Sequence, residues 1–399
     1  MHTRRTNPGS RSAAATITSL ASLLAFTACA TGDRWVERLP DRPDIAVRIR
    51  YEVIDLGLEF LPPSNWPDAH VAGGCGLGDD GTASFTIEHR FPGANGQVVR
   101  NAQIQVYRAN SGHTVAAPGS IAGYAGRVNS LGQTSGSSLF GNPSGTWVAN
   151  TLRPVFVGTD DSVSPLTDQN AEGHATAVNE SGVVVGFRDG GNGLPWGFPS
   201  IIPTMWDSAT AAPRTIGPSG PWGMALDVDR SGNAVGFVQI NIDGSFATAG
   251  WVHRTDGSVA WLGSDAEAIS ETGYIAVNDH PTAHVYRLDG THVWELLPLS
   301  PGEGAWSHVR DVNDAGTCIG ESNGRAVVWS AYSTRRGVAR CRDINRIVSG
   351  LLPAGVELTA GLRLNKSGQL LCRGVVTSAN GSIEEPHVFL IRGLSFIGL

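Results

Sequence analysis

Charged side chains recur at one position of a repeated sequence pattern, and this position is the best candidate for a ligand site. Each repeat carries a glycine at the end of a tight turn, and the candidate position lies five residues before it. If its strand is innermost in a ring of repeats, these side chains meet near the axis. The alternative is that they pair with one another, above all Arg363 with Asp311 from the adjacent copy. The four charged residues are Arg127, Asp227, Asp311 and Arg363.

One turn resembles the start of a calcium-binding loop. Asp227, Asp229 and Ser231 alternate ahead of Gly232, as side-chain ligands do in such a loop. The twelfth position, which requires a bidentate acid, is occupied by Val238. We therefore interpret these three residues as turn caps and expect neither a specific metal site nor another cofactor.

Few other residues have a spacing suited to catalysis. The consecutive acids Asp79-Asp80 and Asp160-Asp161 point to opposite sides of an extended chain, so turn formation explains them better than acid–base chemistry. The sequence has no Cys/His cluster for zinc. A non-catalytic module that binds a glycan, peptide or protein is favoured. The alternative is a hydrolase or lyase acting on an extracellular polysaccharide or another polymer, because a fold excludes no chemistry.

Four cysteines besides Cys29 allow three complete disulfide pairings, and their spacing does not choose among them. Cys75 and Cys372 lie in the first and last repeats, so a bond between them could brace the junction of the two ends. The other two are Cys318 and Cys341.

The repeated turns predict the fold. Around the turn of residues 174–187 (HATAVNESGVVVGF), two β-prone segments flank Asn-Glu-Ser-Gly, which is typical of a hairpin. A third segment with an aromatic residue and a short fourth segment follow in most copies. Units of about 40–50 residues with four strands are typical of propeller blades. We predict an all-β fold, a β-propeller of seven four-stranded blades. The turn glycines are Gly81, Gly132, Gly182, Gly232, Gly273, Gly316 and Gly368.

The two ends of the domain are predicted to share the last blade. Residues 51–56 alternate in polarity and have no partner nearby in the sequence, whereas the last repeat lacks a clear fourth strand. We expect residues 51–56 to pair antiparallel with residues 387–391 as the outermost strand. The propeller domain then covers residues 51–399. Its repeats span about residues 71–124, 125–173, 174–223, 224–265, 266–308, 309–358 and 359–399.

The N-terminus is typical of an export signal. Arg4, Arg5 and Arg11 precede an apolar stretch that is too short to span a membrane. The sequence Phe-Thr-Ala before Cys29 resembles a bacterial lipobox, so residues 1–28 are predicted to be a lipoprotein-type signal peptide and Cys29 the acylated residue. Plain secretion is the alternative. Residues 29–50 are predicted to be a flexible tether to a membrane, the outer membrane where the organism has one.

Composition excludes one class of partner. The chain of 399 residues has a formal net charge of −7 and a single lysine, Lys366. Without a basic stripe, nucleic-acid binding is not expected.

The frame A-x-x-[IV]-[ND]-x-x-G-x-V-V-G, the aromatic strand and the opening YEVIDLG resemble the HAF-repeat family of extracellular bacterial proteins. The resemblance covers about residues 51–399 and is clearest at residues 174–187. The tripeptide that names the family survives as His284-Val285-Tyr286 and His387-Val388-Phe389, and we expect these histidines to be structural. The resemblance implies an extracellular location and no particular activity.

Overall fold

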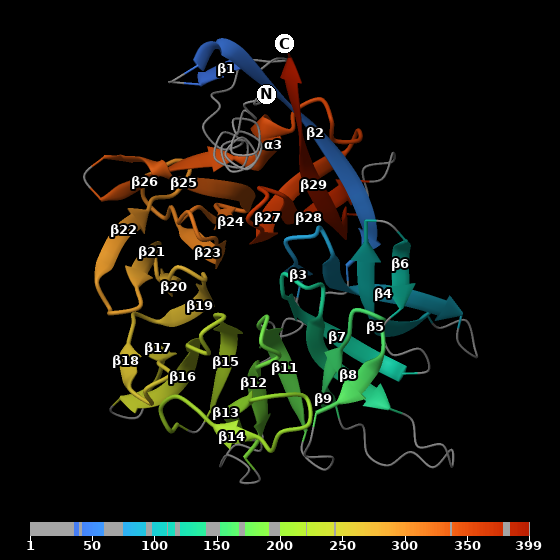
Figure 1. Ribbon diagram of the computed structural model, residues 1–399, viewed down its shortest axis with the longest axis vertical. Coiled ribbons are helices and arrows are strands. Elements are labelled where there is room, and N and C mark those ends of the chain that lie inside the picture. Colours follow the sequence, from blue (N-terminus) through green and yellow to red (C-terminus); the bar gives the residue numbers. More distant parts are fainter. Residues whose placement is uncertain are drawn as a thin grey trace, which may run out of the picture.

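The computed structural model describes residues 36–39, 42–59, 75–92, 98–109, 111–115, 120–140, 152–166, 172–190, 200–220, 222–242, 245–335, 337–377 and 384–398. Its sheets surround a central axis, with one strand of each nearest the centre (Figure 1). The strands form seven antiparallel units, here called blades, of which six have four consecutive strands; short parallel contacts join blades 3 and 4, and blades 5 and 6, into eight-stranded sheets. The predicted all-β propeller of seven blades is confirmed, although the last blade has five strands. Within the described residues no helix is long and apolar enough to cross a membrane.

The first three blades follow one another along the chain. Blade 1 contains β3 (Gly76–Leu77), β4 (Ala83–Pro92), β5 (Val98–Arg108) and β6 (Gly112–Val115). Blade 2 contains β7 (Ser120–Val128), β8 (Thr134–Phe140), β9 (Arg153–Val157) and β10 (Val163–Pro165). Blade 3 contains β11 (Gly173–Val178), β12 (Val184–Asp189), β13 (Ile201–Trp206) and β14 (Arg214–Thr215).

The next three blades repeat this order. Blade 4 contains β15 (Trp222–Val228), β16 (Ala234–Ile242), β17 (Ser245–His253) and β18 (Val259–Trp261). Blade 5 contains β19 (Asp265–Ile269), β20 (Tyr274–Asp279), β21 (Thr282–Arg287) and β22 (His292–Leu296). Blade 6 contains β23 (Ser307–Val312), β24 (Cys318–Ser322), β25 (Arg325–Arg335) and β26 (Val338–Asp343), and the short helix α3 (Ile344–Ile347) follows it.

Blade 7 is built from both ends of the chain. Its strands β27 (Val356–Leu364), β28 (Leu370–Thr377) and β29 (Glu384–Gly398) are joined by β2 (Arg42–Leu58) from the N-terminal side. The predicted pairing is confirmed, since Val53 lies opposite Ile391 and Asp55 opposite Phe389. These two strands run side by side in Figure 1.

The prediction of a tether over residues 29–50 is wrong for two segments. Strand β1 (Val36–Leu39) pairs with β2, and β2 begins at Arg42 and pairs along residues 46–50 with the end of β29. Ile45, Val47 and Ile49 give this segment the alternation of a strand, and the C-terminal residues continue β29 and offer it a partner. Cys29 and the signal peptide lie outside the described residues.

In four of the seven blades a glycine lies four residues after the turn glycine and allows close approach of the two inner strands. In blade 3 Gly186 lies opposite Ala175, beside a bulge in the inner strand. A Cβ at Gly186 would overlap the carbonyl oxygen of His174, and Gly236 and Gly320 meet the equivalent carbonyls of Met224 and His308. The conserved spacing within the chain therefore reflects close backbone contact.

The core lies between neighbouring sheets. The expected third-strand aromatics supply its largest members, and Trp206, Trp251, Trp329 and Phe389 are at most 1% exposed. Between blades 7 and 1, Cys75 and Phe85 pack with Leu371 and Val388 in one cluster. Each sheet thus has both faces covered, which suits the apolar character of its strands.

All four cysteines outside the N-terminal segment are free, so the suggested disulfide between Cys75 and Cys372 does not form. Cys75 packs between blades 7 and 1, whereas Cys372 points to the other face of blade 7 and packs with Ile319 and Leu358. Their side chains are therefore separated by the sheet itself. Burial raises the pKa of the Cys75 thiol to about 12, which disfavours the reactive thiolate.

Candidate functional site

The four charged residues predicted to meet at the axis do so. Each lies on the innermost strand of its blade and lines one pocket. Arg127 is central, with Nη1 2.8 Å from Asp311 Oδ1 and 3.2 Å from Asp227 Oδ2. Arg127 Nη2 donates to the carbonyl oxygen of Glu267 at 2.8 Å. Most of the hydrogen-bonding groups of these side chains are thus used within the cluster, which is the mutual pairing considered from the sequence as the alternative.

The partners differ from the expected ones. Among the described residues Arg127, rather than Arg363, forms the ion pair with Asp311. Arg363 instead donates through Nη1 to the carbonyl oxygens of Arg310 at 2.9 Å and Leu362 at 2.7 Å. The neighbouring blades also contribute backbone donors, since Asp227 Oδ2 accepts from Ile269 N at 2.9 Å.

Burial shifts the pKa values of the acidic and basic members of this cluster in opposite directions, because it disfavours the charged form of each. It raises the pKa of Asp227 to about 6, although the Arg127 guanidinium acts in the opposite direction. Burial lowers the pKa of Arg363, helped by the positive charge of Arg127. Arg127, Asp227, Asp311 and Arg363, here called the charged tier, therefore form a desolvated charge cluster that depends on Arg127 for its stability.

Above this tier the inner turns form a polar pocket of about 120 Å³, to which all seven blades contribute. Its floor is the charged tier, and apolar residues such as Val128 and Val178 form part of its wall. The rim of this pocket, here called the axial rim, is formed by the seven residues that lie two positions before the turn glycines. The axial rim consists of Asp79, Ser130, Glu180, Arg230, Glu271, Asp314 and Lys366.

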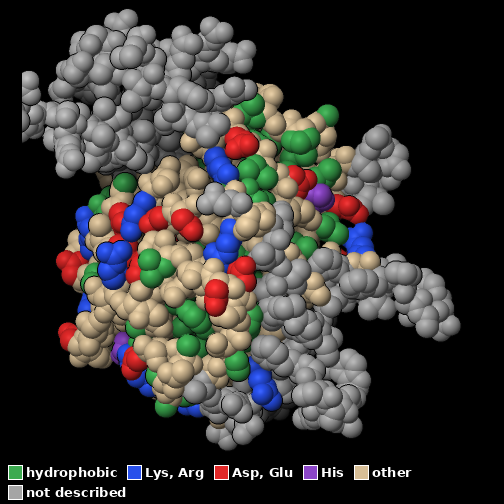
Figure 2. Space-filling model, turned by 45° about the vertical axis from the view of Figure 1, so that its right-hand side comes forward, with side chains coloured by type: hydrophobic (Ala, Val, Ile, Leu, Met, Phe, Trp, Pro, Cys, Tyr) green, Lys and Arg blue, Asp and Glu red, His purple; other side chains and the backbone are tan. Residues whose placement is uncertain are grey.

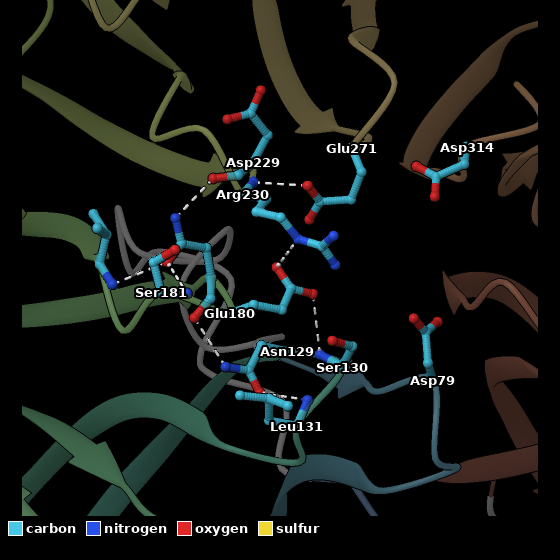
Figure 3. Close-up of polar contacts among 12 residues, drawn as sticks. Asp79, Asn129, Ser130, Leu131, Glu180, Ser181, Asp229, Arg230, Glu271 and Asp314 are labelled. Atoms are coloured by element: carbon cyan, nitrogen blue, oxygen red, sulfur yellow. Dashed lines mark hydrogen bonds and ion pairs between the residues drawn. The ribbon is translucent and has the colours of Figure 1, made fainter.

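Contacts between neighbouring turns hold the axial rim in place. Lys366 Nζ lies 3.4 Å from both Asp79 Oδ2 and Asp314 Oδ2, so one lysine bridges three blades. On the opposite side Glu271 Oε2 accepts from the backbone N–H of Arg230 at 2.8 Å. Figure 3 shows Asp79, Arg230, Glu271 and Asp314 arriving from different turns around one opening.

Glu180 and Glu271 form a carboxyl pair at the axial rim. Burial raises the pKa of Glu271 to about 7, and the nearby Glu180 carboxylate adds to the shift. Burial opposes ionisation of Glu180 as well, but hydrogen bonds from Ser130 and its other neighbours lower its pKa. One oxygen of Glu180 is buried with no hydrogen-bond partner among the described residues, and Arg230 Nε lies 3.8 Å away. The pair can therefore hold one proton near neutral pH.

The turns beneath the axial rim are locked by asparagines. The side-chain oxygen of Asn179 accepts from Ser181 N and Val183 N, at 3.0 and 2.9 Å. Its Nδ2 donates to the carbonyl oxygen of Asp229 in the next blade at 2.8 Å. Asn129 and Asn365 make equivalent bonds to the blades that follow them. Asparagine suits this position because its short amide side chain both accepts and donates.

The calcium-loop candidates are not gathered around one point. Asp229 is engaged by its own turn, with Oδ1 2.8 Å from Asn233 N and Oδ2 2.7 Å from Asn233 Nδ2. Asp227 points instead to Arg127 at the axis. Among the described residues no three His, Cys, Asp or Glu side chains are grouped to hold a metal ion.

The sequence interpretation missed the axial rim, although the alignment on the turn glycine contained its signal. Six of its seven residues are charged, a larger share than at the position that was chosen. The signs vary from copy to copy, and charged residues in turns are commonly solvated, so the pattern did not stand out. The pocket shows that they converge.

Asp265 provides a test of buried charge away from the pocket. Burial raises its pKa to about 7, the Glu267 carboxylate contributes, and Oδ1 lacks a hydrogen-bond partner among the described residues. Because the folded pKa exceeds the unfolded value of about 3.9, this group stabilises the fold below that value. The contribution is lost as pH rises through about 7.

Asp265→Asn should therefore be more stable than the wild type at pH 8, by on the order of 1–2 kcal/mol, and the difference should be clearly smaller at pH 5. Urea unfolding at both pH values measures this difference. Asp207→Asn is the control, since Asp207 is exposed and should change little at either pH. Equal stability of Asp265→Asn and the wild type at pH 8 would show that Asp265 is not a buried charge.

No family model matches the sequence, and no curated protein matches it. Similar solved structures include an acylaminoacyl peptidase from Pyrococcus horikoshii, with TM-score 0.48 and 10% identity over 82% of this chain and 53% of that one. TolB from Acinetobacter baumannii has TM-score 0.36 and 11% identity over 55% and 52%. A gluconolactonase from Xanthomonas campestris has TM-score 0.35 and 9% identity over 74% and 91%. The chain spans about half the length of the first two, and at these scores the likeness says nothing of activity.

Proposed function

We propose that this protein is a non-catalytic binding module of the cell envelope, exported and anchored through a lipid on Cys29. The observation that carries the binding role is the axial pocket, whose rim presents polar or charged side chains from seven blades at one repeated position. We further propose that the chain belongs to the HAF-repeat family, on the motif of residues 174–187.

The chemistry of the axial rim favours a ligand rich in hydrogen-bond donors. Four of its residues are carboxylates and two are cations, and Lys366 is shared between Asp79 and Asp314. Figure 3 shows the carboxyl groups of Glu180 and Glu271 directed toward the opening, where they contact Ser130 and Arg230. Elsewhere on the surface in Figure 2 acidic and basic side chains are interspersed, with neither sign dominant over that face. Sugar hydroxyls or peptide amides are the groups that such a rim would bind.

A second candidate is a hydrolase or lyase on an extracellular polysaccharide or another polymer. It is favoured by one observation, that neighbouring carboxyl groups have pKa values moved in opposite directions, upward for Glu271 and downward for Glu180. Such a pair divides acid and base roles in many enzymes. Binding remains the first proposal because the described residues that line the pocket include no histidine and no cysteine, the side chains that most often form or activate a nucleophile.

A glycan and peptide array probed with the purified protein tests the binding role. We expect a set of ligands whose affinity falls at least about tenfold in Glu180→Gln/Lys366→Gln, because both side chains lie at the axial rim. Asp207→Asn, a charge change outside the pocket lining, should bind like the wild type. If the rim variant bound these ligands as tightly as the wild type, the binding site would have to lie away from the axis.

The same ligands distinguish the second candidate. Mass spectrometry after prolonged incubation should find them intact if the module only binds. Turnover by the wild type, lost in Glu271→Gln with binding retained, would replace the binding proposal with catalysis.

Lipid anchoring has its own test. Metabolic labelling with an alkyne fatty acid should tag the wild-type protein and leave Cys29→Ser untagged, because the thiol of Cys29 would carry the lipid. Equal labelling of both proteins would contradict the anchor, and export without label would support plain secretion.

A further inference from the structure

Two histidine rings face each other on neighbouring strands of blade 5. His284 in β21 and His292 in β22 are placed with Nδ1 of the first 3.2 Å from Nε2 of the second. Their ring centroids are 5.3 Å apart and the ring planes meet at 62°. His292 is exposed and His284 half-buried, so ions and water can reach the pair.

The equivalent histidine of blade 7 has a different partner. His387, like His284, precedes the third-strand aromatic by two residues, and its Nδ1 lies 3.0 Å from both carboxylate oxygens of Asp55. A ring N–H facing a carboxylate is a complete hydrogen bond. In blade 5 the partner is a second imidazole, so at least one of the facing nitrogens must be unprotonated. The arrangement brings a nitrogen lone pair to the surface beside a second ring nitrogen.

The unprotonated nitrogen of the facing pair is available as a ligand, because it is the lone pair of neutral imidazole that binds metal ions. Glu295 lies directly opposite His284 in the strand register, so the two side chains share one side of the sheet.

We propose that His284 and His292 bind one first-row divalent transition-metal ion, Zn²⁺ or Cu²⁺. Two imidazole nitrogens at about 2.0–2.1 Å from a metal lie roughly 3–3.4 Å apart, and the observed separation of 3.2 Å falls in that range. Nitrogen ligands of this kind suit zinc and copper. Since no third protein ligand among the described residues is already in place, water and a rotated Glu295 complete the coordination.

Isothermal titration of the full chain, purified without a histidine tag, with Zn²⁺ or Cu²⁺ alone tests the site. We expect the wild type to bind one ion at the pair, and His284→Gln and His292→Gln each to weaken this binding at least about tenfold. His387→Gln is the matched control, because it removes the equivalent histidine of blade 7 and should leave the affinity unchanged.

A second measurement does not depend on the variants' stability. Substoichiometric Cu²⁺ should broaden the imidazole NMR signals of His284 and His292 before those of other histidines. Affinity that is unchanged in both variants, or broadening that begins elsewhere, would overturn the proposal.

Discussion

Replacing Arg127 with methionine should lower the free energy of unfolding by about 3–5 kcal/mol, the usual cost of removing one partner from a buried ion pair. Arg127 Nη1 contacts both Asp227 and Asp311, and all three side chains are about 10% exposed. Without the guanidinium, two carboxylates from different blades would remain close together at the axis. The loss should be smaller at pH 5 than at pH 8, because protonation of Asp227, whose pKa is already raised to about 6, relieves the repulsion.

Urea unfolding at both pH values measures this effect, and a compensated variant separates charge from packing. Arg127→Met/Asp227→Asn/Asp311→Asn removes all three charges and should recover much of the stability at pH 8. Arg214→Met is the control for losing an arginine from an exposed pair with Asp207, and it should cost less than about 1 kcal/mol. If Arg127→Met were as stable as the wild type, the charge cluster would not hold the inner strands together.

Deleting residues 51–57 should destabilise the domain by several kcal/mol, at the upper end of single-site effects or beyond. The deletion would leave one edge of β29 unpaired and uncover both faces of blade 7. Tyr51 and Val53 pack against the cluster facing blade 6. Leu56 is 4% exposed and belongs to the cluster facing blade 1, where Ile54 also packs.

Thermal and urea unfolding of the deletion, compared with a truncation of residues 394–399, measures this effect. The truncation removes the end of β29, which pairs with residues 46–50 and not with residues 51–57, so its effect should be much smaller. Equal losses from the two changes would show that residues 51–57 are not essential to blade 7.

The fold could be predicted because its repeats are local. A turn glycine and an aromatic third strand return in successive copies, and an asparagine or aspartate lies three residues before the glycine in five of the seven. Each signal reflects one hairpin or one buried position. The first part of β2 could not be predicted in this way. Its partner is the end of β29, more than 300 residues away, so the strand alternation of Ile45, Val47 and Ile49 had no visible partner in the sequence.

The sequence predicts where the candidate site lies, but not which of its side chains contact one another. The alignment correctly brings Arg127, Asp227, Asp311 and Arg363 to the axis, because the strand carrying them is innermost. Which charges pair depends on side-chain reach across the ring, and Arg127 reaches past neighbouring blades to Asp311. The carboxyl pair of Glu180 and Glu271 also joins turns that no local pattern connects.

The shared last blade has a consequence for how the chain reaches its native state. Most blades join strands a few residues apart, so their hairpins can form early with little loss of chain entropy. The pairing of Val53 with Ile391 must instead wait until almost the entire chain has been made. Until then β2 lacks its partner β29, because β29 is the last strand to be synthesised. Blade 7 should therefore be the last sheet to gain protection in pulsed hydrogen exchange, after blades 2 to 6.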